Sequence, residues 1–318
     1  MSSQPHIAIV GSGPAGCYTA QGLRKDWPDA EITVIDRLPV PYGLIRYGVA
    51  ADHQGTKAVT KQFDRLFERG GVTFNGGIEV GVDVDLDDLR AHYDVVVLAT
   101  GLCVDRRLNI PGEYLTGVYG SGQITRLLNG HPDEHGLKPR LGERVVVIGN
   151  GNVAIDLVRL IAKHPDDFAG SDLHPEVHDL IHRPAVQEIV VVGRSGARSA
   201  KFDPAMVKEL AKLAGVDFAV DAMDEPANPQ VAALKHLIEH QIGGDRIRVR
   251  FCFGWTPREV MGADGCVRGV VFAAADGRTW HHEADSVLTA IGFAEQTHLG
   301  ASGEWRSADG RLGDGLYT

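Results

Sequence analysis

The feature that most constrains this chain is a glycine-rich turn that occurs twice, each time between an apolar run and a helix-like segment. The first turn has the pattern G-x-G-x-x-G at Gly11, Gly13 and Gly16, after the apolar run "IAIV". The second has the pattern G-x-G-x-x-A, from Gly149 to Ala154, after "RVVVI". Strand, glycine turn and helix in this order form the phosphate-binding part of a dinucleotide-binding fold. The sequence therefore predicts an α/β protein with two Rossmann-like dinucleotide-binding domains.

Each glycine of the first turn has its own physical role. Gly11 permits the tight turn, and Gly13 lets the backbone approach a pyrophosphate. Gly16 lets the helix, expected to begin at about Pro14, pack closely on the strand. The diphosphate would then lie at the helix N-terminus, where backbone N–H groups and the helix dipole favour an anion.

The ends of the two second strands predict different nucleotides. The strand "EITVID" ends at Asp36, about 20 residues after the turn, where an acidic residue hydrogen-bonds a ribose hydroxyl. In the second domain the strand "EIVVVGR" ends in Arg194. An acidic residue there would repel an additional 2′-phosphate, whereas an arginine pairs with it. We therefore expect the first domain to bind a ribose with free hydroxyls and the second to bind NADP(H).

Two further apolar runs, 93–101 and 284–293, predict the domain boundaries. Both end in small-residue turns, and in flavoproteins with two dinucleotide folds such segments lead the chain out of the FAD domain and back into it. We expect an FAD-binding domain at 1–105 plus 290–318. The NADP-binding domain, at 106–289, would be inserted into it.

Three other segments allow more local predictions. Residues 247–283 alternate apolar and polar residues around glycine-containing turns, which predicts a β-meander attached to the inserted domain. Residues 164–188 are polar and rich in His and Asp, and their spacing favours a helical excursion over a metal site. His281 and His282 are interpreted as residues of a solvent-facing strand. We expect no metal site.

Composition and cysteine spacing exclude several classes of protein. The formal net charge of −10 over 318 residues gives no sign of a nucleic-acid partner. The four cysteines include no C-x-x-C pair, so neither a dithiol relay nor a Cys-rich metal site is indicated. The N-terminus runs into a strand without a signal peptide, and no apolar stretch approaches membrane-spanning length. We expect a cytoplasmic protein without a membrane span.

Six motifs occur along the chain in an informative order: "GSGPAGCY", "LPVPYGLIRYGVAADHQ", "ATGLCVDRRLNIPG", "GNGNVAIDLVR", "VVVGRSG" and "VLTAIGF". In this order, over essentially the whole chain, the sequence resembles the adrenodoxin-reductase-like ferredoxin–NADP reductases, which include bacterial members. The P-Y-G-L-x-R-x-G-V-A-x-D-H block is the most diagnostic, because a dinucleotide fold alone does not require it. The resemblance implies bound FAD, NADPH as electron donor, and a ferredoxin or similar one-electron iron–sulfur carrier as acceptor.

The resemblance also implies site residues. His53 aligns with the active-site histidine of the family and Glu209 with its partner, a pair that can orient groups and buffer charge during hydride transfer. The alternative for this pair is an interdomain ion pair that fixes domain closure. The implied cofactor-binding residues are Gly11, Ser12, Gly13, Ala15, Gly16, Asp36, Gly43, Leu44, Ile78 and Gly101 on the FAD side, and Arg106, Asn150, Gly151, Asn152, Val153 and Arg194 on the NADP(H) side.

Three features depart from the family pattern. Ser195 stands where relatives have a second arginine, and Met206 where they have a glutamate that touches the nicotinamide half, so the preference for NADPH over NADH could be reduced. Arg198 and Lys201 are near enough in sequence to replace the lost arginine, and Arg198 is the predicted additional residue of the NADP(H) site. The chain ends at Thr318, before a region that contacts the flavin in relatives. The C-terminal part of the FAD domain is therefore expected to be incomplete.

The leading functional hypothesis is an FAD-dependent oxidoreductase that passes electrons from NADPH through the flavin to a ferredoxin-type protein. A second hypothesis is a flavoprotein reductase with another acceptor, such as a quinone, oxygen or a partner subunit. A third is a truncated, non-catalytic paralogue that binds nucleotide without turnover. Disulfide reductase chemistry is disfavoured, because no paired cysteines could relay electrons.

Overall fold

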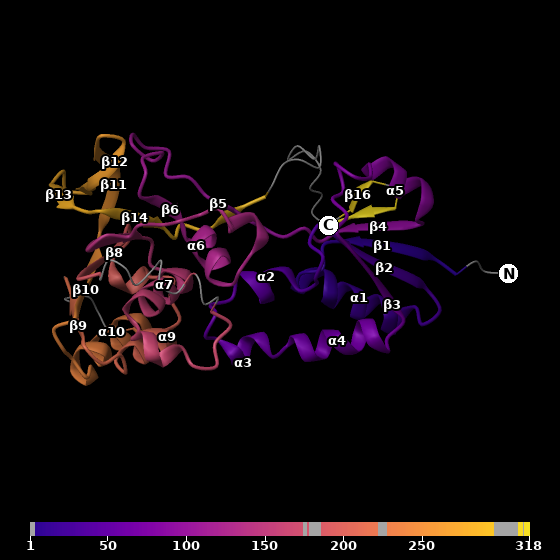
Figure 1. Cartoon of the computed structure of the whole chain (residues 1–318), viewed down its shortest axis with the longest axis horizontal. Coiled ribbons are helices and arrows are strands. Elements are labelled where there is room, and N and C mark those ends of the chain that lie inside the picture. The colour runs from indigo at the N-terminus through magenta and orange to yellow at the C-terminus, as the bar shows by residue number, and fades with distance from the viewer. Residues whose placement is uncertain (1–3, 174–176, 178–185, 222–227, 296–310, 314) are drawn as a thin grey trace. The chain divides into compact units, whose positions relative to one another are not determined.

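The chain folds into two compact units, each built on its own parallel sheet (Figure 1). The computed structural model describes residues 4–173, 177, 186–221, 228–295, 311–313 and 315–318. The first unit comprises Met1–Val49, His53–Val104 and Ala294–Thr318, and the second comprises Ala50–Asp52 and Asp105–Phe293.

The sheet of the first unit has the strand order β16-β17-β4-β1-β2-β3. Its four strands β3, β2, β1 and β4 are parallel neighbours, β17 adds to β4 in parallel, and β16 is antiparallel to β17. The strands are β1 (His6–Val10), β2 (Glu31–Asp36), β3 (Val72–Gly76), β4 (Val95–Leu98), β16 (Arg311–Gly313) and β17 (Leu316–Tyr317).

Helices cover both faces of this sheet, because successive residues of a strand point to opposite faces. Ile7 and Ile9 of β1 pack on one face with residues of α1 and α4, whereas Ala8 and Val10 share the other face with Leu89 of α5. The helices are α1 (Pro14–Asp26), α2 (Gly43–Tyr47), α3 (Gln54–Lys57), α4 (Thr60–Glu68) and α5 (Leu86–His92).

The sheet of the second unit has the strand order β6-β14-β7-β8-β10-β9, and every neighbouring pair is parallel. The apolar runs predicted as buried strands lie at its centre, where β7 and β8 are almost wholly buried. The strands are β6 (Val118–Gly120), β7 (Arg144–Ile148), β8 (Glu188–Gly193), β9 (Val216–Val220), β10 (Ile247–Phe253) and β14 (Ser286–Thr289).

Different layers cover the two faces of the second sheet. Val145 and Val147 pack with the helices, whereas Val146 and Ile148 pack with a three-stranded antiparallel sheet. The helices are α6 (Ser121–Leu128), α7 (Asn152–Ala162), α9 (Pro204–Leu210) and α10 (Pro229–His240), with 3₁₀ turns η1 (Pro132–Glu134), η2 (Pro165–Phe168) and η3 (Ala197–Ser199). The small sheet contains β11 (Trp255–Ala263), β12 (Cys266–Ala274) and β13 (Thr279–Glu283).

The predicted α/β fold with two Rossmann-like halves is confirmed, but the predicted meander is partly wrong. Residues 247–253 form β10, a parallel strand between β8 and β9, and the antiparallel sheet begins only at Trp255. The alternation of apolar and polar residues in β10 ends at Phe251, beyond which the strand is buried on both faces. Burial on both faces is typical of a parallel strand rather than of a meander.

The interpretation of the two adjacent histidines is half correct. Both lie in strand β13, and His281 is exposed. The side chain of His282, however, is only 14% exposed, and its ring packs 5.1 Å from that of Trp280. In the part of the chain that the structure describes, no three His, Cys, Asp or Glu side chains come together as a possible metal site.

The chain passes from the first unit into the second between residues 104 and 105, and it returns to the first unit between residues 293 and 294. The sequence suggested boundaries at 105/106 and 289/290. At these crossings β5 (Val104–Asp105) pairs with β15 (Phe293–Ala294). Of the predicted helical excursion at 164–188, η2 forms the start, and residues 174–176 and 178–185 lie outside the described residues. Most of the C-terminal stretch, 296–310 and 314, lies outside them as well.

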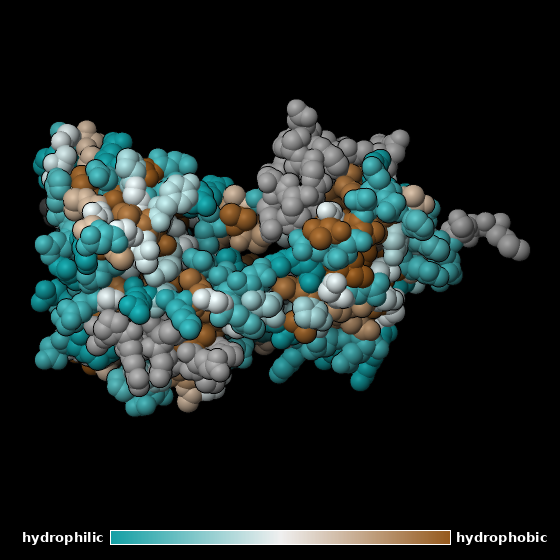
Figure 2. All heavy atoms as spheres, turned by 45° about the horizontal axis from the view of Figure 1, so that its top comes forward, coloured by the Kyte–Doolittle hydropathy of each residue, from teal (hydrophilic) through white to brown (hydrophobic). Residues whose placement is uncertain are grey.

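The surface seen in Figure 2 is largely hydrophilic, with apolar residues in smaller groups between the polar ones. Within the residues that the structure describes, no helix combines the length and the apolar character that a membrane crossing requires.

Candidate dinucleotide-binding sites

The first glycine turn is shaped by contacts that only glycine permits. Gly11 has φ +108°, and a Cβ there would lie 2.3 Å from the carbonyl oxygen of Ala99. A Cβ on Gly16 would lie 1.9 Å from the carbonyl oxygen of Gly11, so the helix and strand touch there. A Cβ on Gly13, in contrast, would meet no heavy atom within 4 Å. The turn therefore presents one open side at Gly13, next to the N-terminus of α1, which fits the predicted pyrophosphate position.

The Asp36 carboxylate holds this turn from the end of β2. Its Oδ2 accepts hydrogen bonds from the backbone N–H of Ser12 at 2.8 Å and from the Ser12 hydroxyl at 2.5 Å. Its Oδ1 accepts the backbone N–H of Leu38 at 2.9 Å. A carboxylate offers about four acceptor sites, so Asp36 keeps capacity for a ribose hydroxyl. Asp36 thus fixes the loop and keeps acceptor capacity for the predicted ribose hydroxyl.

The segment that contains Tyr42 and Gly43 returns along the chain to the same turn and packs against it. The backbone N–H of Tyr42 donates to the carbonyl of Ser12 at 3.0 Å, and a Cβ on Gly43 would lie 3.2 Å from Cα of Gly13. Tyr42 itself has φ +89°, a left-handed conformation that is costly for a tyrosine. Its ring is buried, its hydroxyl donates to Asp64, and burial together with that carboxylate raises the tyrosine pKa.

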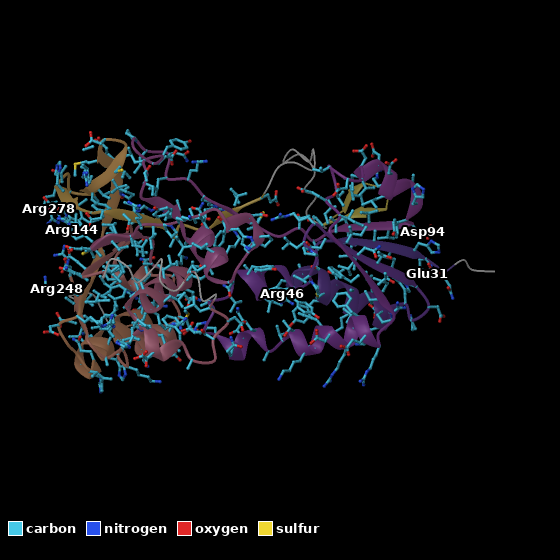
Figure 3. All side chains as sticks on the ribbon, viewed as in Figure 1. Glu31, Arg46, Asp94, Arg144, Arg248 and Arg278 are labelled. Carbon is cyan, nitrogen blue, oxygen red and sulfur yellow. The ribbon has the colours of Figure 1, made fainter. Side chains whose placement is uncertain are left out.

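The remaining candidates of the first unit lie around this turn. Leu44, in α2, is 55% exposed, and Ala15 is exposed in the first turn of α1. The N–H of Ile78 donates to the carbonyl of Asp36 at 3.0 Å, so its backbone is already engaged on the donor side. Gly101 has φ +70° and open space around its Cα. Figure 3 shows Arg46 of α2, whose guanidinium lies 5.6 Å from the centre of the Tyr42 ring.

The second glycine turn repeats the backbone pattern of the first. The N–H of Gly149 donates to the carbonyl of Val192 at 2.9 Å, as the N–H of Gly11 donates to that of Ile35 at 2.7 Å. Gly149 has φ +128°, and a Cβ there would lie 2.1 Å from the carbonyl oxygen of Ala290. The two turns are thus the same structure, built on different strands.

This repetition corrects the position that we expected to be equivalent to Asp36. Because Ile35 corresponds to Val192, the counterpart of Asp36 is Gly193 and not Arg194. Strand β8 accordingly ends at Gly193, and Arg194 is the exposed residue that follows it. The second unit therefore has no side chain at the position that Asp36 occupies in the first unit, and it has a cation one residue beyond that position.

Polar groups of the second turn tie it to the segment before α9. The side-chain oxygen of Asn152 accepts the N–H of Asp203 at 2.6 Å. The carbonyl of Asn150 accepts the N–H of Lys201 at 3.2 Å, and Gly151 pairs with Lys201 in an isolated parallel bridge. Asn152 is exposed and Val153 half-buried at the start of α7.

Two predicted arginines of the second unit are held by backbone contacts. Arg106 donates its N–H to the carbonyl of Gly292 at 3.0 Å and its Nε to that of Phe293 at 2.8 Å. The carbonyl of Arg198, in η3, accepts the side-chain amide of Asn228 at 2.8 Å, while its side chain is exposed.

His53 and Glu209 belong to different units, and each is described within its own. His53 is half-buried and precedes α3, where its carbonyl accepts the N–H of Lys57 at 3.1 Å. Glu209 is exposed on α9. Met206, the residue that departs from the family pattern, packs against the core of the second unit.

Sequence reasoning missed a buried ion cluster beside His53. The Asp52 side chain is only 6% exposed and forms ion pairs with Arg159 and Lys163 of the α7 region, while Arg159 also bonds Asp156 at 2.6 Å. Burial raises the pKa of Asp52, but the hydrogen bonds and charges of its two cations outweigh burial and lower it. An arginine among the buried residues of α7 was the available signal, but its partner lies far away in sequence.

The cysteines do not form a redox pair. Cys17, Cys252 and Cys266 are free thiols. Burial, followed by the nearby Asp36 charge, raises the pKa of Cys17 to about 12. Burial and the hydrogen bond to Asp221 raise the pKa of Cys252 to about 12. Such thiols are poor nucleophiles, because the thiolate is the reactive form.

Comparison with known proteins gives a consistent result. The sequence profile of the family described as pyridine nucleotide-disulphide oxidoreductase matches residues 5–310. The cindoxin reductase of Citrobacter braakii is 48% identical over 299 residues, which cover 91% of this chain and 65% of that protein. A probable ferredoxin/ferredoxin–NADP reductase of Mycobacterium leprae is 38% identical, over 90% of this chain and 54% of that protein.

Among solved structures, Mycobacterium tuberculosis FprA in complex with NADPH superposes with a TM-score of 0.91. Its sequence identity is 31%, over 99% of this chain and 78% of that one. The thioredoxin reductase of T. acidophilum shares the fold at a TM-score of 0.57 and 17% identity. The chain spans roughly half to two thirds of the length of the curated relatives named above.

Proposed function

The chain belongs to the pyridine nucleotide-disulphide oxidoreductase family, and on this premise we propose that it is an FAD-dependent reductase that passes electrons from NADPH to a ferredoxin-type iron–sulfur protein. The resemblance to the adrenodoxin-reductase-like ferredoxin–NADP reductases is confirmed by the names and similarity of the matched relatives. The activity, the substrates and the partner of this chain are our proposal.

The single observation that carries the proposal is that the two units have equivalent glycine turns but different residues at the end of the second strand. Both turns have an open side at their second glycine and a helix N-terminus beside it. The first turn has the Asp36 carboxylate at the end of its second strand, and the second turn has Gly193 followed by Arg194. One site therefore suits a ribose with free hydroxyls, and the other suits a ribose that carries a 2′-phosphate.

The first unit fits FAD, because the missing side chain of Gly13 leaves a cradle that a Cβ would fill. When bound, FAD supplies the chemistry that accepts a hydride and releases electrons singly. The chain would contribute binding and orientation: the N-terminus of α1 and Gly13 for the diphosphate, Asp36 for the ribose, and Gly43 and Leu44 near the flavin half. Ser12 and Gly16 keep the turn in shape.

In the second unit, Arg194 would pair with the 2′-phosphate of NADPH, since guanidinium groups bind phosphates with parallel hydrogen bonds. The backbone of Asn150, Gly151, Asn152 and Val153 would receive the diphosphate at the N-terminus of α7. We assign His53 and Glu209 to holding and orienting a proton beside the reacting rings. The Asp52 cluster supports this assignment, because it fixes the residue that precedes His53.

The acceptor is proposed from the relatives, whose names include cindoxin, adrenodoxin and ferredoxin reductases. A quinone, oxygen or a partner subunit remains the second candidate acceptor. We also propose a reducing, cytoplasmic compartment, which the wide spacing of the four cysteines along the sequence supports.

Steady-state reduction of cytochrome c by NADPH, with and without an added ferredoxin, tests the proposal. We expect reduction that depends on the protein, on FAD and on the ferredoxin. Reduction that is independent of ferredoxin but supported by quinone or oxygen would favour the second acceptor class. A protein that never acquires a flavin absorbance band after addition of FAD would favour the non-catalytic alternative.

A further inference from the structure

The second unit repeats one more feature of the first, and this feature places a lysine at the nucleotide turn. In the first unit the N–H of Tyr42 donates to the carbonyl of Ser12 at 3.0 Å. In the second unit the N–H of Lys201 donates to the carbonyl of Asn150 at 3.2 Å. Ser12 and Asn150 each lie between the first two glycines of their turn. Tyr42 and Lys201 therefore occupy equivalent positions on the segments that return past the turns.

The side chains at these two positions differ in their burial and in their partners. Tyr42 is 5% exposed and donates its hydroxyl to Asp64, inside the first unit. Lys201 is exposed, and within the described part of the chain no carboxylate forms an ion pair with it. The second unit thus carries a positive charge, without a carboxylate partner among those residues, at a position that the first unit fills with a buried ring.

Lys201 lies close to Gly151, the second glycine of the turn. The two residues pair in an isolated parallel bridge. Apart from Gly151 and its two chain neighbours, the Cβ of Lys201 is the one heavy atom of the described residues within 4 Å of a Cβ built on Gly151, at 3.8 Å. The second glycine of such a turn is where the backbone approaches a pyrophosphate. The Lys201 side chain therefore starts at the open side of the turn, next to the N-terminus of α7.

We propose that Lys201 is a binding residue for the diphosphate of the dinucleotide in the second unit. This inference rests on the proposed function of that unit. Lysine is a compact charge on a flexible stem and binds phosphate as a point charge, and the helix N-terminus adds positive potential at the same place. Arg194, which directly follows β8, would bind the 2′-phosphate.

This assignment differs from a replacement of the arginine that Ser195 lacks. A substitute for that arginine would act on the 2′-phosphate and hence on NADP⁺ alone. A residue that binds the diphosphate contributes to the affinity for NADP⁺ and for NAD⁺ alike, since both contain the diphosphate bridge. Lys201 would therefore raise the affinity for both dinucleotides without changing the preference between them.

The test is the dissociation constant of NADP⁺ and of NAD⁺, measured by isothermal titration calorimetry on the full chain loaded with FAD. We expect Lys201→Met to weaken both dinucleotides by a similar factor, about 10-fold to 100-fold, since a hydrogen bond to a charged group contributes about 1.5–3 kcal/mol. Lys201→Arg should restore most of the affinity. The loss should shrink at high salt, because the site is exposed.

The matched control is Lys208→Met, which removes an exposed lysine of α9. It should leave both dissociation constants unchanged, and the melting temperatures of both variants should report intact folds. A Lys201→Met protein that binds both dinucleotides like wild type would overturn the inference, as would a loss confined to NADP⁺. A wild-type protein that binds neither dinucleotide would contradict the proposed function as well, so the two failures are distinguishable.

Discussion

The side-chain amide of Asn150 lies against Gly193, where the first unit has the Asp36 carboxylate. A Cβ on Gly193 would come within 2.4 Å of Nδ2 of Asn150. In the first unit the equivalent pair is Ser12 and Asp36, which hydrogen-bond each other directly. A side chain at position 193 would therefore require the Asn150 amide to move, and the glycine found there leaves the end of β8 open to a phosphate group.

Arg194→Ala tests the assignment of the 2′-phosphate. We expect the dissociation constant of NADP⁺ to rise about 10-fold to 100-fold, because an arginine–phosphate pair is lost, while that of NAD⁺ stays unchanged. Calorimetric titration measures both. Arg248→Ala, which removes an exposed arginine of β10 (Figure 3), is the control. Equal losses for the two dinucleotides would contradict the role of Arg194.

Gly13→Ala tests whether the first turn holds a diphosphate. Gly13 has φ −68° and open space at its Cβ position, so the fold should tolerate alanine. The added methyl group would occupy the open side, and we expect FAD affinity to fall at least 10-fold, measured by quenching of flavin fluorescence. Gly22→Ala, also with open space and within α1, should keep FAD affinity and stabilise the helix by about 0.5–1 kcal/mol. Similar FAD affinities in both variants would contradict the site.

Asp52→Asn tests the buried ion cluster. The variant leaves Arg159 with only Asp156 as its acidic partner in the cluster, so we expect the free energy of unfolding at neutral pH to fall by about 3 kcal/mol. The folded-state pKa of Asp52 is lowered, so its stabilisation is present above the unfolded value of about 3.9 and is lost as pH falls through the folded value. The difference between wild type and variant in urea unfolding should therefore disappear in strong acid. Asp276→Asn, at an exposed turn, should unfold like wild type, and a constant difference at all pH values would refute this account.

Thiol labelling tests the absence of a dithiol relay. Cys17 and Cys252 are buried, with pKa values raised to about 12, whereas Cys266 is exposed. In the folded protein at pH 8, mass spectrometry after iodoacetamide treatment should find Cys266 modified first and the two buried thiols protected. Rapid modification of Cys17 or Cys252 would contradict the burial of that thiol in the folded protein.

Much of the fold could be predicted because its determinants are local. The positive φ of Gly11 and Gly149 and the tight contacts of their Cα atoms demand glycine, so the turns are visible in the sequence. Strand β2 ends at Asp36 and helix α1 begins at Pro14, as predicted, because the apolar run and the proline mark those points.

The parts that could not be predicted depend on register and on distant partners. The sequence alone could not identify Gly193 as the counterpart of Asp36, because this equivalence follows from hydrogen bonds between strands. Lys201 meets the second turn through a returning segment whose path is set by tertiary packing. Asp52 pairs with Arg159 across 107 residues, and no local pattern links the two.

The most direct test of the central claim is anaerobic reduction of the FAD-loaded chain by NADPH and by NADH, followed by stopped-flow absorbance of the flavin band. We predict that NADPH bleaches the band in a single protein-bound step, that Arg194→Ala slows this step at limiting NADPH, and that this substitution leaves the reaction with NADH unchanged. A bound flavin that NADPH does not reduce, or reduction by NADPH that is indifferent to Arg194, would contradict the account.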